Sequence, residues 1–260
     1  MEQHISIGNT YMNVISFGKG SKNLTVIAGV SLTGLEGMGD ALEDALSVLA
    51  ENFTVYVFDR LKVLPKGHST EDMAEDIYYC LKKLGVEHTY VYGVSHGGMI
   101  GQMLAINHPA LVEKLVLCST ISRYKGLQND IVEKWLEAAK RQDVEAVNQL
   151  FIDNVYSEAY IDSISDIIPA ILKNGSAEDC DRFVILAEAI KSFDSYDLLD
   201  KIECPVYVIC DKNDNVVGDK PSYELADKLQ CKLHVYDQYS HAVYDEAPDI
   251  KERIRDFLLL

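Results

Sequence analysis

An alternation of short apolar runs with longer segments of helical periodicity constrains the fold more than any other feature of this sequence. The alternation extends from the N-terminal third of the chain to Cys118. Strands that alternate with helices imply right-handed crossovers and a parallel sheet with helices on both faces. The pattern therefore predicts an α/β fold. The predicted strands are 24–28, 54–58, 89–94 and 114–118, and the predicted helices are 40–50, 70–84 and 97–107.

A predicted hairpin precedes this alternation. Residues 5–7 and 11–17 flank Gly8-Asn9-Thr10, and Gly-Asn supplies the positive φ that a tight turn requires. Two further strand patterns, at 205–210 and 232–236, come near the end of the chain, before a last helix from about residue 248. We therefore expect a mostly parallel central sheet of about eight strands.

Between these two groups of strands the sequence is helical from residue 129 to about 193. Asp143, Ser157 and Ser176 occupy positions typical of helix N-caps. Pro169 is expected to kink or end the third of four helices. The chain is therefore divided into an α/β core, residues 1–122 and 196–260, and an inserted four-helix cap, residues 123–195.

The clearest chemical signal is the pentapeptide Gly93-Val94-Ser95-His96-Gly97. It fits Gly-x-Ser-x-Gly between a predicted strand and a predicted helix, where a serine is held on a strained turn with its hydroxyl exposed. The two glycines suit a steric need, because a Cβ at either position would collide with neighbouring backbone. Ser95 is therefore the candidate nucleophile, although an ordinary glycine-rich turn would show the same five residues.

A serine nucleophile needs a base, and the base needs an orienting acid. His241 follows the last predicted strand by five residues, and its position singles it out among seven histidines. The loop after strand 205–210 supplies Asp214, which we assign as the acid, with Asp211 at the strand end kept as the alternative. The order Ser95, Asp214, His241 is the chain order of the α/β-hydrolase triads.

With these residues in place, the chain resembles the α/β-hydrolase superfamily over nearly its whole length. The segment 194–205 looks like the lead-in to the acid-bearing strand, and His241 followed by Glu246-x-Pro248 looks like the family's ending. Within the superfamily the chain is most similar to small members with a four-helix cap, such as enol-lactone hydrolases, carboxylesterases and carbon–carbon bond hydrolases. The resemblance implies the α/β-hydrolase fold and a cap that closes a substrate pocket.

The resemblance also implies an oxyanion hole. One donor would be the backbone N–H of His96, which follows the nucleophile. The other would be the backbone N–H of Val30, in the loop after strand 24–28. The family usually has His-Gly in that loop, whereas this chain has Ala28-Gly29. Because the donor is a backbone group, loss of that histidine does not remove it.

Three residues are candidate substrate contacts: Leu32, Met99 and Trp135. Leu32 and Met99 flank the oxyanion loop and the nucleophile, and we expect them to form the pocket floor. The cap's large aromatic residues each suit the cap core better than a substrate contact, and Trp135 is kept as a candidate contact among them. These aromatic residues are Trp135, Phe151, Tyr156 and Phe183.

Charge narrows the range of partners. The chain has 24 Lys and Arg against 41 Asp and Glu, a net charge of −17. Phosphate backbones and anionic lipids are held mainly by clustered Lys and Arg, so we expect no nucleic acid or membrane partner. Residues 121–200 alone carry 8 basic and 16 acidic side chains, which gives about twice the net negative charge per residue of the remainder. Neutral or cationic acyl compounds should therefore approach the cap more easily than polyanions.

The six cysteines contain no Cys-x-x-Cys pair, so the sequence predicts no metal, and it predicts no cofactor. The acidic N-terminus lacks the features of a signal peptide, which favours a cytoplasmic protein. A homodimer is compatible with the sequence, although no residue specifies one.

The sequence thus predicts a serine hydrolase acting on an ester, lactone or similar small acyl substrate. The alternatives within enzymes are a carbon–carbon bond hydrolase or an acyltransferase with the same triad. The alternative outside catalysis is a ligand-binding homologue of low turnover.

Overall fold

A computed structural model describes residues 1–127 and 129–260; Gln128, which falls in the predicted cap, lies outside the described residues. The described strands form one eight-stranded sheet in the order β1-β2-β4-β3-β5-β6-β7-β8. This confirms the predicted sheet. The strands are β1 (Glu2–Ile7), β2 (Thr10–Phe17), β3 (Lys22–Ile27), β4 (Phe53–Leu61), β5 (Thr89–Val94), β6 (Val112–Cys118), β7 (Val206–Asp211) and β8 (Lys232–Tyr236).

The sheet is antiparallel at one edge and parallel elsewhere. β1 and β2 form the hairpin, whose turn includes Gly8 at φ 57°. β2 also pairs antiparallel with β4, and the pairings from β4 through β3, β5, β6 and β7 to β8 are parallel. Because parallel strands end at the same edge, the loops after β3, β5, β7 and β8 meet there.

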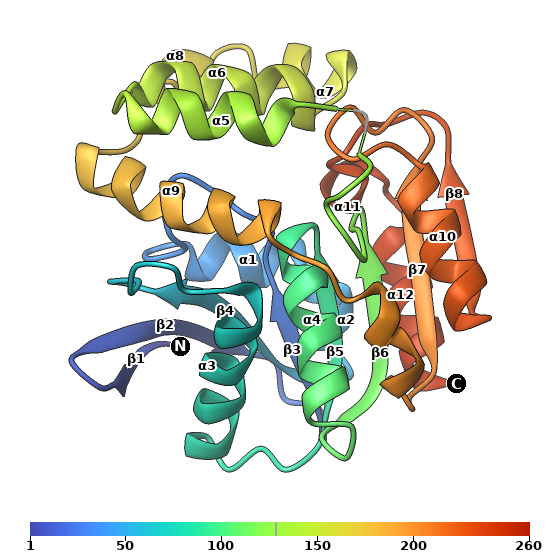
Figure 1. The fold of residues 1–260 in the computed structure, drawn as a ribbon. Helices are drawn as coiled ribbons and strands as arrows, with labels where there is room; N and C mark the ends of the chain where they lie inside the picture. Colours follow the sequence, from blue (N-terminus) through green and yellow to red (C-terminus); the bar gives the residue numbers. More distant parts are fainter. Residues whose placement is uncertain (128) are drawn as a thin grey trace.

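Helices cover both faces of the sheet (Figure 1). Successive residues of β6 alternate between two cores: Leu115 and Leu117 belong to one, and Val116 and Cys118 to the other. The first core includes α3 (Thr70–Lys83), α4 (His96–Asn107) and α10 (Lys220–Leu229). The second includes α2 (Ser47–Ala50) and α12 (Ile250–Leu259). The remaining short elements of the core are α1 (Gly39–Ala45), η1 (Tyr196–Lys201) and α11 (Val243–Glu246).

The inserted helices lie between β6 and β7 in the chain and stand over the sheet edge to which β6 points (Figure 1). They are α5 (Ile131–Lys140), α6 (Val144–Val155), α7 (Glu158–Ser163), α8 (Ile168–Ile171) and α9 (Ala177–Lys191). Asp143, Ser157 and Ser176 each accept a backbone N–H bond as the predicted N-caps. Their hydrogen bonds fix where α6, α7 and α9 begin.

Two helix predictions are wrong in detail. The segment predicted as one helix at 40–50 is two short helices, α1 and α2, separated at Leu46. The predicted third cap helix is likewise two pieces, α7 and α8, so five helices rather than four lie in the described insertion. Pro169 opens α8 instead of ending a helix, because proline lacks only an N–H that the first turn leaves unpaired anyway. Sequence patterns also left α10 and α11 unassigned.

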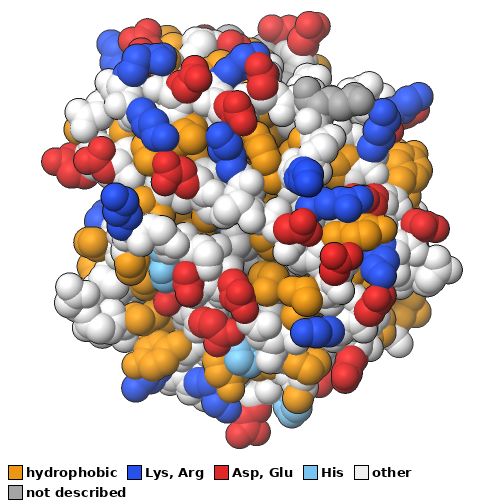
Figure 2. Space-filling model, viewed as in Figure 1, with side chains coloured by type: hydrophobic (Ala, Val, Ile, Leu, Met, Phe, Trp, Pro, Cys, Tyr) orange, Lys and Arg blue, Asp and Glu red, His pale blue; other side chains and the backbone are white. Residues whose placement is uncertain are grey.

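Within residues 1–127 and 129–260 no helix combines the length and apolarity needed to cross a membrane. On the face seen in Figure 2, acidic and basic side chains are mixed over both the inserted helices and the core. The net negative charge is therefore not gathered into one acidic patch on that face.

A buried polar link joins the core to the segment that returns from the inserted helices. Ser195 donates from Oγ to Gln102 Oε1 at 2.9 Å, and Gln102 Nε2 donates to the Ile121 carbonyl at 2.9 Å. Ser195 and Gln102 are fully buried. A buried amide is costly unless it is hydrogen-bonded, so this link fixes how the chain re-enters the core.

We predict that Ser195→Ala lowers the free energy of unfolding by about 1–3 kcal/mol, because Gln102 Oε1 loses its buried donor. Urea denaturation followed by far-UV circular dichroism measures this. Ser47→Ala, at an exposed position, is the matched control and should stay within about 0.5 kcal/mol of the wild type. Equal stability of the two variants would contradict the assigned role of the link.

Candidate active site

Ser95 lies at the turn between β5 and α4 in a strained backbone conformation, φ 51° and ψ −119°. Non-glycine residues rarely adopt positive φ, so the surroundings must hold it there. The N–H of Ser95 donates to the Cys118 carbonyl at 2.8 Å, and Thr120 Oγ1 donates to the Ser95 carbonyl at 2.7 Å. β6 and the residues after it therefore fix both sides of the strained peptide.

The flanking glycines are needed for close approach. A Cβ at Gly97 would lie 2.0 Å from the carbonyl oxygen of Ile27, at the end of β3. A Cβ at Gly93 would lie 2.5 Å from the carbonyl oxygen of Gly97. Both distances are shorter than any tolerated contact, so only glycine permits α4 to begin directly against the end of β3.

His241 connects to both predicted partners. Its Nδ1 is 2.7 Å from Asp214 Oδ2, and its Nε2 is 2.9 Å from Ser95 Oγ. With the ring proton on Nδ1 donated to the carboxylate, Nε2 accepts from the serine hydroxyl. Ser119 Oγ donates to the His241 carbonyl at 2.8 Å, which positions the loop that carries the histidine. The structure thus brings Ser95, His241 and Asp214 into one hydrogen-bonded chain.

The two carboxylates in the β7 loop have different partners. Asp214 Oδ1 accepts the N–H groups of Val216 and Val217, each at 2.8 Å, which leaves Oδ2 directed at His241. Asp211 accepts the N–H of Asn213 at 2.7 Å and the N–H of Tyr239 at 2.9 Å. Asp211 therefore ties the β7 loop to the histidine loop and does not contact the imidazole.

The loop after β3 lies against the nucleophile. A Cβ built on Gly29 would be 3.4 Å from Ser95 Cβ, and Val30 lines the same cavity as Ser95. Arg60, which is buried, donates from Nη2 to the Ala28 carbonyl at 2.6 Å. Burial lowers the pKa of Arg60 to about 10, against the raising effect of Asp59. The buried Arg60 guanidinium therefore fixes the start of the loop after β3.

Asp59 extends the support to the far end of that loop. Its Oδ2 accepts the N–H of Leu35 at 2.8 Å, while its Oδ1 accepts from Arg182 of α9 at 3.1 Å. The side chains of Asp59 and Arg182 are 13% and 10% exposed, so this ion pair is largely desolvated. One carboxylate thus holds both the loop after β3 and an inserted helix.

His96, which follows the nucleophile, has a fully buried side chain. Its Nε2 lies 3.2 Å from Thr70 Oγ1. Burial lowers the pKa of His96 well below its ordinary value of 6.5, and the positive charge of Arg60 lowers it further. The imidazole of His96 is therefore neutral in the folded protein at neutral pH.

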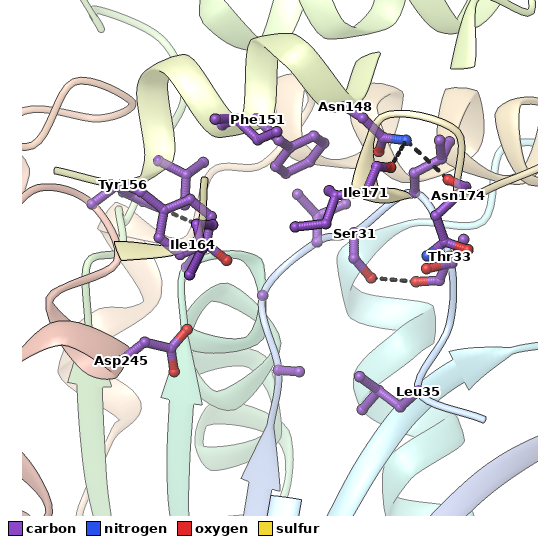
Figure 3. Close-up of a pocket in the computed structure, with 18 of the residues that line it drawn as sticks. Ser31, Thr33, Leu35, Asn148, Phe151, Tyr156, Ile164, Ile171, Asn174 and Asp245 are labelled. Atoms are coloured by element: carbon purple, nitrogen blue, oxygen red, sulfur yellow. Dashed lines mark hydrogen bonds between the residues drawn. The ribbon is translucent and has the colours of Figure 1, made fainter. Parts of the chain in front are cut away.

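A cavity of about 440 Å³ lies between these loops and the inserted helices (Figure 3). Ser95, His241 and Val30 line it, together with the predicted contacts Leu32 and Trp135. The remaining described lining is mostly apolar. It includes Phe151, Ile152, Val155, Ile164, Ile167 and Ile171. The Ser95 hydroxyl therefore faces a mostly apolar cavity of the size that holds a small organic molecule.

Some predicted contacts are placed differently. Met99 is 2% exposed, belongs to the first core, and is not among the described lining residues. The reason is that every residue of the first turns of α4 is buried under the sheet edge. Of the aromatic residues assigned to cap core, Phe151 and Tyr156 line the cavity and Phe183 does not.

Sequence patterns do not point to most of the polar groups in the cavity wall, which include Ser31, Thr33, Asn148, Asn174, Tyr160, Tyr244 and Asp245. Tyr244 and Asp245 come three and four residues after His241, so their spacing from the histidine was the only available signal. No cluster of three or more His, Cys, Asp or Glu suited to a metal ion occurs in the part of the chain that the structure describes.

The inserted helices are bonded directly to the histidine loop. Ala242 donates its N–H to the Val155 carbonyl of α6 at 2.8 Å. Glu246 accepts the N–H of Ser157 at 2.9 Å and also binds its hydroxyl, at the start of α7. The cavity roof and the loop that carries His241 are therefore parts of one bonded unit.

The family model for the alpha/beta hydrolase fold matches residues 30–248. The protein named "Putative carbamate hydrolase RutD" from Serratia proteamaculans is 40% identical over 90 residues, 32% of this chain and 34% of that protein. The matched part thus spans about a third of that relative's length. RutD of Escherichia coli O157:H7 is 26% identical over 199 residues, 72% of this chain and 74% of that protein.

The fold matches solved structures over nearly their whole length. The enol-lactonase of Burkholderia xenovorans LB400 superposes with a TM-score of 0.86 at 18% identity, covering 99% of this chain and 100% of that one. At this identity the likeness concerns the fold alone.

We predict that His96→Gln weakens the loss of stability on acidification. Because the folded state holds His96 at a pKa below 6.5, the unfolded state takes up the proton first, so folding is destabilised as pH falls through 6.5. Between pH 7.5 and 5.5 the wild type should lose about 1 kcal/mol more unfolding free energy than the variant. Urea denaturation at both pH values tests this, and parallel losses would contradict it.

Proposed function

This chain belongs to the α/β-hydrolase fold family, and we propose on that premise that it is a serine hydrolase that cleaves an ester, lactone or similar small acyl substrate. The observation that carries the proposal is the hydrogen-bonded chain from Asp214 through His241 to Ser95, with the serine lining the cavity. Neither fold nor family alone specifies a reaction, whereas this arrangement suits nucleophilic acyl transfer.

In the first half-reaction, Ser95 Oγ attacks the substrate carbonyl while His241 Nε2 takes the hydroxyl proton. The new C–O bond and the electron pair displaced onto the carbonyl oxygen give a tetrahedral oxyanion. As that intermediate collapses, the bond to the leaving group breaks and His241 returns the proton to it. Asp214 holds the imidazole in the required tautomer and stabilises the imidazolium that forms in between.

In the second half-reaction, a water molecule replaces the leaving group. His241 takes its proton, the oxygen attacks the acyl carbon, and Ser95 leaves with the proton returned from Nε2. The products are the carboxylic acid and the free enzyme. The apolar lining of the cavity favours this sequence, because charge interactions strengthen where water is limited.

The backbone N–H groups of Val30 and His96 are the donors that we assign to the oxyanion. Neither group donates a backbone hydrogen bond within the described ranges, and Val30 lines the cavity beside Ser95. Preorganised donors of this kind contribute about 3–4 kcal/mol each to transition-state stabilisation. Arg60 and Asp59 act as positioning residues, since they fix the two ends of the loop that carries Val30.

The inserted helices would serve as a cap that encloses the substrate, with the division at residues 123–195 that the sequence predicts. The names of the similar proteins support acyl chemistry, because a carbamate and an enol-lactone both present a carbonyl bonded to a leaving group. A homologue that only binds ligands would have the same triad but would fail to form an acyl-enzyme, so covalent labelling separates the two functions.

We predict that a fluorophosphonate probe labels the wild type at Ser95 and that Ser95→Ala abolishes both labelling and hydrolysis of short p-nitrophenyl esters. The reason is that the probe phosphonylates only an activated serine. Mass spectrometry of the labelled peptide and absorbance at the p-nitrophenolate band measure the two effects. Ser31 also lines the cavity but has no base beside it, so the control variant Ser31→Ala should still be labelled at Ser95. Wild-type turnover in Ser95→Ala would exclude the proposal.

We predict that Asp214→Asn lowers kcat for ester hydrolysis by a factor of roughly 10³–10⁴, because the amide stabilises the wrong histidine tautomer. Asp211→Asn is the matched control on the same loop. It removes a loop support rather than the acid, so its effect on kcat should be at least tenfold smaller. A larger rate loss for Asp211→Asn would transfer the role of the acid to Asp211.

A further inference from the structure

Asp245 brings a carboxylate into the wall of the cavity, four residues after His241. It lies on α11, and Figure 3 shows its side chain directed toward the open space below Tyr156. The residue lines the cavity and is exposed to it. Burial within the surrounding protein nevertheless raises the pKa of Asp245 above its ordinary value of 3.8. The carboxylate therefore lies in the cavity wall and remains accessible to solvent.

The carboxylate of Asp245 has no hydrogen bond and no ion pair within the described ranges. Its two charged neighbours act only through space: Lys251 lowers its pKa and Glu246 raises it. Lys251 is occupied by the Tyr244 carbonyl and does not line the cavity. Glu246 is occupied by Ser157. A carboxylate in the cavity wall without a hydrogen-bonded partner attracts a cation placed beside it.

Three tyrosines line the same cavity close enough to Asp245 to be affected by its charge: Tyr156, Tyr160 and Tyr244. The rings of Tyr156 and Tyr160 stack with centroids 4.8 Å apart, and Tyr244 lies with its ring centroid 6.3 Å from that of His241. Burial raises the pKa of all three phenols, and the negative charge of Asp245 raises each of them further. The rings therefore stay neutral, and their faces can attract a cation.

The described residues that line the rest of the cavity provide no charged group suited to bind a negatively charged ligand. No Lys or Arg is found among the described residues that line it, and Asp245 is the only acid there. His241, the other titratable lining group besides the tyrosines, is engaged by Asp214 and Ser95. A substrate carboxylate would meet an unpaired like charge without a compensating cation.

We propose that Asp245 with Tyr156, Tyr160 and Tyr244 forms a binding site for a positively charged group, so that the substrate class is an acyl compound with an ammonium or similar cationic end. This inference rests on the proposed hydrolase function, because it names the substrate of that same cavity. Asp245 and the tyrosine faces bind the cation, and the adjacent His241 positions the acyl carbon at Ser95.

Two acetate esters of equal shape test the site: the ester of choline, which is cationic, and the ester of 3,3-dimethylbutanol, which is neutral. We expect the wild type to favour the choline ester by about tenfold in kcat/KM, the effect of one partly buried ion pair with aromatic neighbours. Asp245→Asn should bring the ratio to about one, and Asp245→Glu should restore part of it. A wild-type ratio of one or less, or an unchanged ratio in Asp245→Asn, overturns the proposal.

Asp162→Asn is the matched control. It removes one negative charge from α7, the helix that carries Tyr160, but Asp162 is exposed and is not among the described lining residues. The variant should keep the wild-type ratio. If it lowers the ratio as much as Asp245→Asn does, the preference comes from the general field of the inserted helices and the site assignment is wrong.

Failure of this inference is separable from failure of the hydrolase proposal. If neither ester is hydrolysed and Ser95 is not labelled by the fluorophosphonate, the proposed function fails. Calorimetric titration of the choline ester into Ser95→Ala and into the Ser95→Ala, Asp245→Asn double variant still decides the site without turnover. Roughly tenfold weaker binding to the double variant supports it, and equal binding contradicts it.

Discussion

The close approach of α4 to the end of β3 is the steric constraint on which the rest of the site depends. Only a residue without a side chain fits at Gly97, where a Cβ would overlap the Ile27 carbonyl. That approach goes together with the positive φ of Ser95 and places the loop after β3 directly beside Ser95 Cβ. Ser95 and the loop after β3 are therefore positioned by one contact, and neither can be moved without the other.

Asp214 and Asp211 have different hydrogen-bond partners at the carboxyl edge of the sheet. Asp214 accepts two backbone N–H groups and keeps one oxygen for His241. Asp211, three residues earlier, binds only backbone N–H groups of the two loops that must meet. Orientation of the imidazole and alignment of the loops are thus separate functions of neighbouring carboxylates, which explains why two aspartates occur within one short loop.

Local sequence patterns predicted the strands, the hairpin and the N-caps. Runs of β-branched residues, the Gly-Asn turn and Ser or Asp caps determine the backbone conformation only of residues close to them in the chain. Sequence patterns also led to Ser95, Asp214 and His241 through chain order. They failed at Leu46 and Pro169, where tertiary packing divides the helices. The positions of Met99 and Asp245 relative to the cavity could not be predicted from the sequence, for a different reason. Whether a side chain faces a cavity depends on how distant elements pack, and adjacent positions in sequence have similar patterns.

The inserted helices are held with unequal strength. α5, α6 and α9 each bury several residues, and α9 is also bound to Asp59 through Arg182. α7 and α8 bury none, and Ile167 between them is 55% exposed. Displacing residues 158–171 therefore breaks far fewer contacts than lifting the whole layer. Molecules should therefore pass between the cavity and bulk water most easily at residues 158–171, while Arg60 and Asp59 continue to hold the loop after β3.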